Sequence, residues 1–506
     1  MTPNLLYKGD KPARNRQPLV NDLIQDLNLD HIFKAMAQGD DYIYRVASDV
    51  IMNSLTDIGT ISYRQEILND CMARANEAKR LYSLATDAVN ETNRYKENTK
   101  PSYARVVSAT TRLASSAKLL ELTVSHLEIL MKYASEVRNR FTSEGMVRFF
   151  KTIEEKITGN FLDRAEKLIS ELQCLGDYRI TLGAKLGLGL KGSGYVLRSL
   201  ERKGFLMLRK LKKTFARKAV TIDLESMGIA KSAKDFQEAA LIRVLRVVNS
   251  FSEKAVRFFE ELRFETAFYT GCINLAGALE KLKAPFTMPN AYDAGERKLC
   301  FKGLYDMSIA LQEKRLPVPN DLATEDIWLY IVTGANQGGK STYLRSIGLA
   351  QVMMQCGMFV AAESFGSNVS DAVLTHFIRG EDAAMNSGKL DLELKRMSEI
   401  MKHITGNSLL LMNESFATTT EREGARIAKG IILALYENRN KTIFVTHLFD
   451  FADEFHKRGE PHAYFLRAER RDQGERTFRI IPGKPLYTSY GEDLYNAIIG
   501  PESAGE

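Results

Sequence analysis

Residues 327–350, IWLYIVTGANQGGKSTYLRSIGLA, decide the fold of this chain. An apolar run of strand length is followed by a glycine-rich turn and then by a stretch with helical periodicity. The turn, Gly334 to Thr342, has the pattern G-x-x-x-x-G-K-[ST], in which backbone N–H groups at a helix N-terminus surround phosphate groups. A glycine-rich turn can also be a plain connection, but the order strand, turn, helix favours nucleotide binding.

The residue types of this loop predict separate roles. Lys340 is expected on the β- and γ-phosphates, and Ser341 on Mg²⁺. The predicted cofactors are therefore ATP and Mg²⁺. The full predicted nucleotide-binding set is Gly334, Ala335, Asn336, Gln337, Gly338, Gly339, Lys340, Ser341 and Thr342.

Two further apolar runs, LLLMN (409–413) and TIFVTH (442–447), end in polar residues. After the first, Asn413 is a candidate magnesium ligand and Glu414 a candidate general base that orients the attacking water. After the second, His447 is a candidate sensor of the γ-phosphate. Alone, an acid after an apolar run is usually a strand end, and a single histidine is usually structural. Their order after the loop favours one hydrolytic site.

The composition and the hydrophobic periodicity of the chain change near residues 285–300. Before this point glycine and proline are sparse and helical periods dominate, whereas strand-length and helical stretches alternate after it. We therefore predict a multidomain α plus α/β protein, with a long-helix domain over residues 1–290 and a nucleotide-binding domain over 291–506. The second domain is expected to hold a mostly parallel sheet covered on both faces.

One segment interrupts the helical half. Residues 177–205 read as a small β-hairpin, and nine Lys or Arg residues against one acid follow between Arg198 and Lys218. This insert, residues 177–220, is a candidate contact for a nucleic-acid backbone, although a run of charges is more often only a solvated face. The candidate contacts are Arg198, Lys203, Arg209, Lys210, Lys212 and Lys213.

The bulk composition excludes some classes. The 506 residues carry a net charge of +7, which permits a polyanionic partner without requiring one. Five scattered cysteines form no CxxC pair, so the sequence indicates neither a disulfide framework nor a zinc site. No run of about 18 apolar residues is present, so we expect no membrane partner and a cytoplasmic location.

The motifs taken together resemble those of the MutS-type ATPases, the family of DNA mismatch-repair proteins and their paralogues. The resemblance rests on VPNDL (318–322), TGANQGGKSTYLRSIGL (333–349), GMFVAAES (357–364), LLLMNESFATTTEREG (409–424), TIFVTH (442–447) and SYGEDLYNAI (489–498). It implies a helical core and lever domain with a reduced, β-rich clamp at 177–220, followed by a P-loop, ABC-like ATPase domain. It also implies a homodimer with composite ATP sites that closes on duplex or branched DNA, with Asn336 supporting the transition state. The repair partners are not specified by the sequence.

The sequence departs from the family in three places. The core-like helices begin within about 45 residues, without the Phe-x-Glu wedge of mismatch readers, so we expect recognition of DNA structure rather than of a mismatch. The Ser-Thr-Phe run of the family's signature loop is absent, and Ser387, Gly388 and Lys389 are candidate replacements acting in trans, or else an ordinary loop before a helix. Finally, Asn413 stands where the family has Asp; an amide keeps the oxygen but loses the charge, which predicts weak Mg²⁺ binding and slow hydrolysis.

Two other functions stay open at this point. A related ATPase acting on structured RNA or ribosomes would use the same basic insert. A scaffold that binds nucleotide with little turnover would fit Asn413 and the missing signature, although Glu414 and His447 argue against it.

Overall fold

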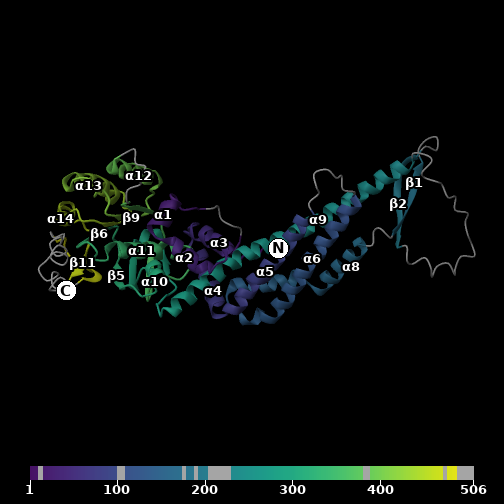
Figure 1. The fold of residues 1–506 in the computed structure, drawn as a ribbon, viewed down its shortest axis with the longest axis horizontal. Helices are drawn as coiled ribbons and strands as arrows, with labels where there is room; N and C mark the ends of the chain where they lie inside the picture. The colour runs from purple at the N-terminus through teal and green to yellow at the C-terminus, as the bar shows by residue number, and fades with distance from the viewer. Residues whose placement is uncertain are drawn as a thin grey trace, which may run out of the picture. The chain divides into compact units, whose positions relative to one another are not determined.

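The computed structural model describes residues 1–9, 15–99, 109–173, 178–186, 192–202, 229–379, 388–470 and 476–486 (Figure 1). The chain divides into two compact units. Unit 1 contains residues 1–3, 79–142 and 146–265, and unit 2 contains residues 4–78, 143–145 and 266–506. These units are interleaved in the sequence and do not follow the predicted division near residue 290, which stays a prediction about sequence domains.

Unit 1 is built from long helices and one hairpin. Its helices α6 (Ala109–Val137) and α8 (Gly159–Gln173) lie against each other, and α6 buries an apolar stripe that includes Leu120, Val124 and Leu127. In the hairpin, β1 and β2 pair antiparallel from Tyr178 opposite Arg202 to Leu186 opposite Gly192. The elements are α5 (Ala75–Asn98), α6 (Ala109–Val137), η1 (Arg138–Arg140), α7 (Glu144–Lys156), α8 (Gly159–Gln173), β1 (Tyr178–Leu186), β2 (Gly192–Arg202) and α9 (Ile229–Lys281), the last of which continues into unit 2.

Unit 2 holds the other helices and two sheets. Its helices are α1 (Val20–Asp26), α2 (Leu29–Ala37), α3 (Asp41–Ile51), α4 (Ile58–Ala73), η6 (Ala294–Glu296), α10 (Met307–Glu313), α11 (Lys340–Gln355), α12 (Lys389–His403), α13 (Glu421–Glu437) and α14 (Phe449–Arg458). Its strands are β3 (Asn290–Tyr292), β4 (Leu299–Leu304), β5 (Asn320–Thr324), β6 (Leu329–Thr333), β7 (Ser364–Asn368), β8 (Val373–Phe377), β9 (Leu409–Asn413), β10 (Lys441–Val445), β11 (Ala463–Arg470) and β12 (Arg476–Pro482).

The larger sheet has the strand order β12-β11-β6-β10-β9-β8. The strands from β11 to β8 are parallel, and β12 joins antiparallel to β11 at the edge. Because β10 lies between β6 and β9, the carboxyl ends of these three strands meet at one edge of the sheet. The smaller sheet has the order β3-β7-β4-β5.

Helices cover both faces of the larger sheet, as Figure 1 shows for α12 and α13 on one side and α11 on the other. On the first side, a continuous apolar core joins β6, β8, β9 and β10 to α12, α13 and α14. On the other side, Gly348 brings α11 close to the strands, because a Cβ atom there would lie 2.6 Å from Leu411 Cδ1. The close approach at Gly348 places α11 directly against β9, which carries Leu411.

Residues 4–78 belong to unit 2 because buried polar side chains tie them to it. The Arg64 guanidinium, which is fully buried, donates to the carbonyl oxygens of Leu6 and Cys356. Gln355, the last residue of α11, donates to Ser54 Oγ and to the Leu55 carbonyl oxygen. A buried hydrogen bond lost without replacement is costly, so these bonds hold residues 4–78 against the part of unit 2 that contains α11.

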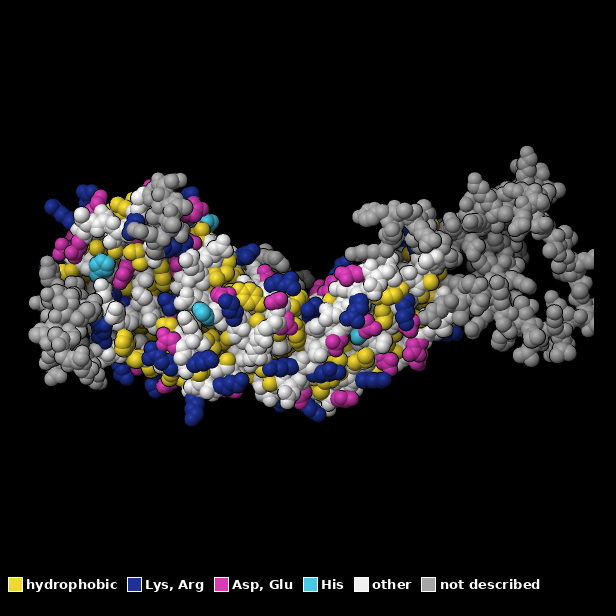
Figure 2. Space-filling model, in the orientation of Figure 1, with side chains coloured by type: hydrophobic (Ala, Val, Ile, Leu, Met, Phe, Trp, Pro, Cys, Tyr) yellow, Lys and Arg dark blue, Asp and Glu magenta, His cyan; other side chains and the backbone are white. Residues whose placement is uncertain are grey.

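The described surface is mixed in charge. On the face drawn in Figure 2, Lys and Arg side chains are interspersed with Asp and Glu over the described helices. Most of the basic insert, residues 177–220, falls outside the described residues. In the described part of the chain, no helix is long and apolar enough to cross a membrane.

Candidate nucleotide-binding site

The loop between β6 and α11 is the centre of the site. Gly334 (φ 117°) and Gly339 (φ 87°) lie in the left-handed region that favours glycine. Side chains are also excluded by space, because a Cβ atom at Gly334 would lie 2.9 Å from Ala468 Cβ and 3.0 Å from Ala468 N. The strand, the turn and the helix occur where the sequence predicts them.

Lys340, the first residue of α11, lies over this loop. Its side chain is buried, and Nζ donates to the carbonyl oxygens of Gly334 at 2.8 Å and Ala335 at 2.9 Å. Burial lowers the pKa of Lys340, and the negative charge of Glu414 acts in the opposite direction. The Lys340 ammonium group therefore lies inside the loop, where a bound phosphate oxygen could accept hydrogen bonds in place of the Gly334 and Ala335 carbonyl oxygens.

Ser341, which follows Lys340 in α11, forms a hydrogen bond with Asn413. Ser341 Oγ donates to Asn413 Oδ1 at 2.9 Å, joining the second residue of α11 to the last residue of β9. The buried Asn413 is opposite Val445 of β10 and Phe377 of β8. The parallel register therefore delivers Asn413 to the edge where α11 begins.

These two oxygens suit a hard cation. Mg²⁺ takes oxygen ligands and keeps several waters, so a pair of protein oxygens beside phosphates is a suitable set. Among the described residues no group of three or more His, Cys, Asp or Glu side chains is arranged to hold a metal. Ser341 Oγ and Asn413 Oδ1 are the oxygen atoms at this sheet edge that could hold a Mg²⁺ ion together with a nucleotide.

Glu414 follows Asn413 in an uncommon conformation. Its φ is 53°, and its backbone N–H donates to the Val445 carbonyl oxygen at 2.8 Å. The side chain is half-buried, and its negative charge acts to raise the pKa of Lys340. The sequence predicts Glu414 by its place after the strand, but the left-handed turn that directs it away from the strand is not visible in the sequence.

His447 and Asn336 are both exposed. His447 follows Thr446, whose N–H donates to the Val332 carbonyl oxygen at the end of β6. Asn336 lies in the loop itself, beside Gln337. Both residues are therefore at the same sheet edge as Lys340, through β10 and the loop respectively.

The β11–β12 hairpin supplies residues that the sequence does not predict. Ala468 closes over Gly334, and Arg476 donates to Gln337 Oε1 at 2.6 Å. Phe478 is 47% exposed with φ 59°, and its carbonyl oxygen would lie 3.2 Å from a Cβ at Gly339. No motif indicated them, because Ala468 reaches the loop through the pairing of β11 with β6, and Arg476 and Phe478 through the pairing of β12 with β11.

Of the remaining predicted residues, the structure describes Gly388, Lys389 and the backbone of Arg198, and the others lie outside the described residues. Gly388 caps the N-terminus of α12 and Lys389 is its first residue, while Ser387 is outside the described residues. Arg198 lies in β2, where only the backbone is described. Outside the described residues are Lys203, Arg209, Lys210, Lys212, Lys213 and the segment 489–498.

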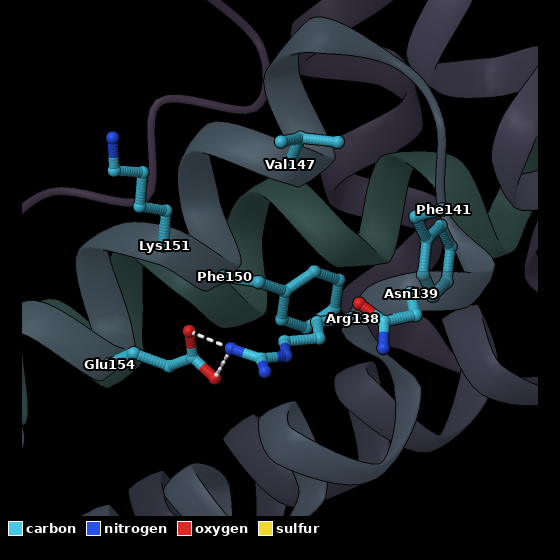
Figure 3. Close-up of a pocket in the computed structure, with 7 residues that line it drawn as sticks. All are labelled: Arg138, Asn139, Phe141, Val147, Phe150, Lys151 and Glu154. Atoms are coloured by element: carbon cyan, nitrogen blue, oxygen red, sulfur yellow. Dashed lines mark hydrogen bonds and ion pairs between the residues drawn. The ribbon is translucent and has the colours of Figure 1, made fainter.

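Unit 1 contains a separate pocket, drawn in Figure 3. It is lined by Arg138, Asn139, Phe141, Val147, Phe150, Lys151 and Glu154. Figure 3 shows Arg138 reaching Glu154, with which it forms an ion pair. None of the predicted site residues lines this pocket, and its arginine already has a carboxylate partner.

The chain matches two family models. One, described as MutS2 N-terminal domain, covers residues 56–282, and the other, described as MutS domain V, covers residues 330–504. The second match includes the whole loop from Gly334 to Thr342 and the strands that carry Asn413 and His447. Together the two matches span most of the chain.

Curated relatives agree with the family models. The DNA mismatch repair protein MutS of Desulfitobacterium hafniense is 34% identical over 182 residues, covering 34% of this chain and 20% of that protein. The protein of the same name from Thermus aquaticus is 34% identical over 180 residues, covering 35% of this chain and 22% of that protein. The protein of that name from Protochlamydia amoebophila is 28% identical over 261 residues, covering 48% and 29%.

The chain thus spans about a fifth to three tenths of the length of these relatives. The match to MutS domain V includes the glycine-rich loop. With two family models of this group matched in chain order, the chain belongs to the MutS family.

Proposed function

We propose that this chain binds and hydrolyses ATP with Mg²⁺ and couples the nucleotide state to DNA binding. The observation that carries the proposal is the 2.9 Å contact between Ser341 Oγ and Asn413 Oδ1, beside the buried Lys340. This contact brings a metal-binding hydroxyl, an oxygen ligand and a phosphate-binding ammonium group to one sheet edge. Few structural roles require these three groups together at a helix N-terminus.

The residues divide the work as follows. The loop N–H groups and Lys340 hold the phosphates, and Asn336 supports the charge that develops on them. Ser341 and Asn413 would hold Mg²⁺, which supplies charge neutralisation when bound. Glu414 orients the attacking water, and His447 contacts the γ-phosphate end from β10.

Slow turnover follows from Asn413. A neutral amide oxygen attracts Mg²⁺ less strongly than a carboxylate does, while Glu414 retains the charge needed to orient water. We therefore expect hydrolysis that is measurable but requires a high Mg²⁺ concentration.

DNA is the proposed partner because of the family and of the basic insert that contains β1 and β2. We further propose a homodimer in which Ser387, Gly388 and Lys389 of one chain complete the other chain's ATP site. The insert then acts as a clamp on duplex or branched DNA, through Arg198, Lys203, Arg209, Lys210, Lys212 and Lys213.

The test is phosphate release by the purified chain, alone and with homoduplex, mismatched and four-way-junction DNA or structured RNA. ATP-dependent binding that prefers the junction, with DNA-altered turnover, is the expected result. Preference for the mismatch would overturn recognition by DNA structure, and preference for RNA would replace the proposed partner.

A nucleotide-gated scaffold is the second candidate, and the neutral Asn413 is the observation that favours it. In that case ATP would bind and alter dimerisation without phosphate release. Dimerisation measured with ATP and with a non-hydrolysable analogue, together with phosphate release, separates the two functions.

A further inference from the structure

The segment that carries Glu414 is backbone-strained. Glu414 (φ 53°) and Phe416 (φ 65°) both lie in the left-handed region, and neither is glycine. Such conformations cost free energy and persist only where neighbouring groups enforce them. Ser415 lies between them and is fully buried, so contacts of its side chain can hold the two residues in this conformation.

Ser415 is held by a buried histidine. Ser415 Oγ lies 2.6 Å from His376 Nδ1 and 3.0 Å from the His376 carbonyl oxygen. His376 is fully buried in β8, and its ring is stacked on Phe416 with 5.5 Å between ring centroids. One residue of β8 thus contacts two successive residues of the strained segment.

The other ring nitrogen decides the tautomer. His376 Nε2 lies 3.1 Å from the Glu393 carbonyl oxygen, which only accepts hydrogen bonds, so Nε2 carries a proton. Burial lowers the pKa of His376 to about 4, which keeps the ring neutral near pH 7. Nδ1 is therefore an acceptor, so the single Ser415 hydroxyl proton is shared between His376 Nδ1 and the His376 carbonyl oxygen, both of which accept.

Helix α12 holds the same segment from the other side. Thr418 Oγ1 donates to Glu393 Oε2 at 3.1 Å, and Arg396 donates to the Phe377 carbonyl oxygen at 2.7 Å. Glu393 therefore touches the histidine through its carbonyl and the segment after Glu414 through its carboxylate. Since α12 begins at Lys389, the predicted signature residues Gly388 and Lys389 are directly connected to this set of contacts.

We infer that His376 and Ser415 are positioning residues for Glu414, and that α12 controls the orientation of Glu414 through the bond between His376 Nε2 and Glu393. The inference rests on the proposed ATP hydrolysis and deepens it. Both residues are fully buried, and the Ser415 hydroxyl fixes the backbone turn that aims the Glu414 carboxylate. A shift of α12 changes the orientation of the His376 imidazole. Through Ser415, it then changes the orientation of the Glu414 carboxylate.

The test is a set of variants in the full chain, assayed for nucleotide affinity and for phosphate release at saturating ATP. Ser415→Ala removes the donor and should lower kcat roughly tenfold without changing the ATP Kd, as loss of an outer supporting bond does in other sites. Ser415→Thr keeps the hydroxyl and should restore kcat. Ser408→Ala is the matched control, because Ser408 is a fully buried serine just before β9, at the opposite end of the strand, and its loss should leave kcat unchanged.

Two histidine variants separate the two bonds. In His376→Asn the amide replaces Nδ1 and can still meet Ser415, whereas in His376→Gln it replaces Nε2 and can still meet Glu393. If both bonds are needed, each variant lowers kcat; if only the Ser415 bond matters, His376→Asn retains activity and the control by α12 is overturned. Unchanged ATP Kd in each variant verifies that the site is folded.

The decisive measurement is a double-mutant cycle with Glu414→Gln. If Ser415 acts through Glu414, Ser415→Ala causes no further loss in the Glu414→Gln background, whereas a purely structural effect would lower both backgrounds equally. Equal losses, or no loss from Ser415→Ala in the parent, would overturn the inference and leave the proposed hydrolysis intact. Absence of phosphate release from the parent chain would instead refute the proposed hydrolysis, and the positioning role with it.

Discussion

Ser341 Oγ donates to Asn413 Oδ1 at 2.9 Å, so the first turn of α11 is joined to the end of β9 through two neutral oxygen atoms. The same two atoms are the proposed Mg²⁺ ligands. Asn413 stands where the MutS-type motif has Asp, so this position bears a neutral amide within hydrogen-bond distance of Ser341, the other proposed Mg²⁺ ligand.

Restoring the charge at residue 413 should strengthen metal binding. In Asn413→Asp we expect the Mg²⁺ concentration for half-maximal phosphate release to fall by roughly tenfold, because a carboxylate attracts the cation more strongly than an amide oxygen. A Mg²⁺ titration of steady-state hydrolysis measures this. An unchanged midpoint would remove Asn413 from the proposed metal site.

Lys340 should control nucleotide affinity. Lys340→Ala removes a buried ammonium group from the phosphate loop, and we expect ATP binding to weaken by roughly tenfold or more. Lys302→Ala is the control, because Lys302 is exposed and paired with Glu363 on the surface. Equal affinity of the two variants, measured by equilibrium titration with a fluorescent ATP analogue, would contradict the assignment.

Glu414 should affect the chemical step rather than binding. Glu414→Gln keeps the size of the side chain and removes its charge, so kcat should fall by roughly 100-fold while the ATP Kd stays within about twofold. Single-turnover phosphate release separates the two quantities. Turnover equal to that of the parent would show that another group orients the water.

Phe478 should contribute a surface for the nucleotide base. It is exposed beside Gly339, and an aromatic contact contributes about 0.5–1.5 kcal/mol, so Phe478→Ala should weaken ATP binding by roughly two- to twelvefold. Phe478→Tyr keeps the ring and serves as the control. If inorganic triphosphate binding weakens as much as ATP binding, the ring acts on the loop and not on the base.

Lys441 should make the stability of the fold depend on pH. It is fully buried, and burial lowers its pKa from 10.5 to about 7, while its Nζ donates to Lys298, Ser367 and Asn368. Between these two pKa values the unfolded chain binds a proton that the folded chain does not. The free energy of unfolding should therefore rise with pH across this window, by up to about 1.4 kcal/mol per pH unit.

Denaturant titrations of the parent and of Lys441→Met at several pH values measure this slope. The variant should show a flatter dependence between pH 7 and 10, whatever its stability at one pH. Parallel curves for the two proteins would show that Lys441 stays protonated in the folded state.

Local signals predicted the centre of the site and the main strands. The pattern from Gly334 to Thr342 is a backbone requirement, since only glycine fits the left-handed turns at Gly334 and Gly339, and it therefore shows in the sequence. The positions of Asn413, Glu414 and His447 at one sheet edge follow from the sequence, because buried parallel strands are continuous apolar runs whose carboxyl ends lie together; the roles of these residues stay predictions. These features depend only on residues close together in the chain, so they can be predicted from one sequence.

The tertiary structure alone decided what supports this centre. Ala468 and Phe478 reach the loop by strand pairing at a sheet edge, and residues 4–78 join the C-terminal unit through buried bonds such as that of Arg64. His376 and Ser415 meet only because β8 and β9 lie side by side. Pairing partners and buried polar contacts depend on which surfaces meet after the chain has folded, and no local pattern of residues specifies them.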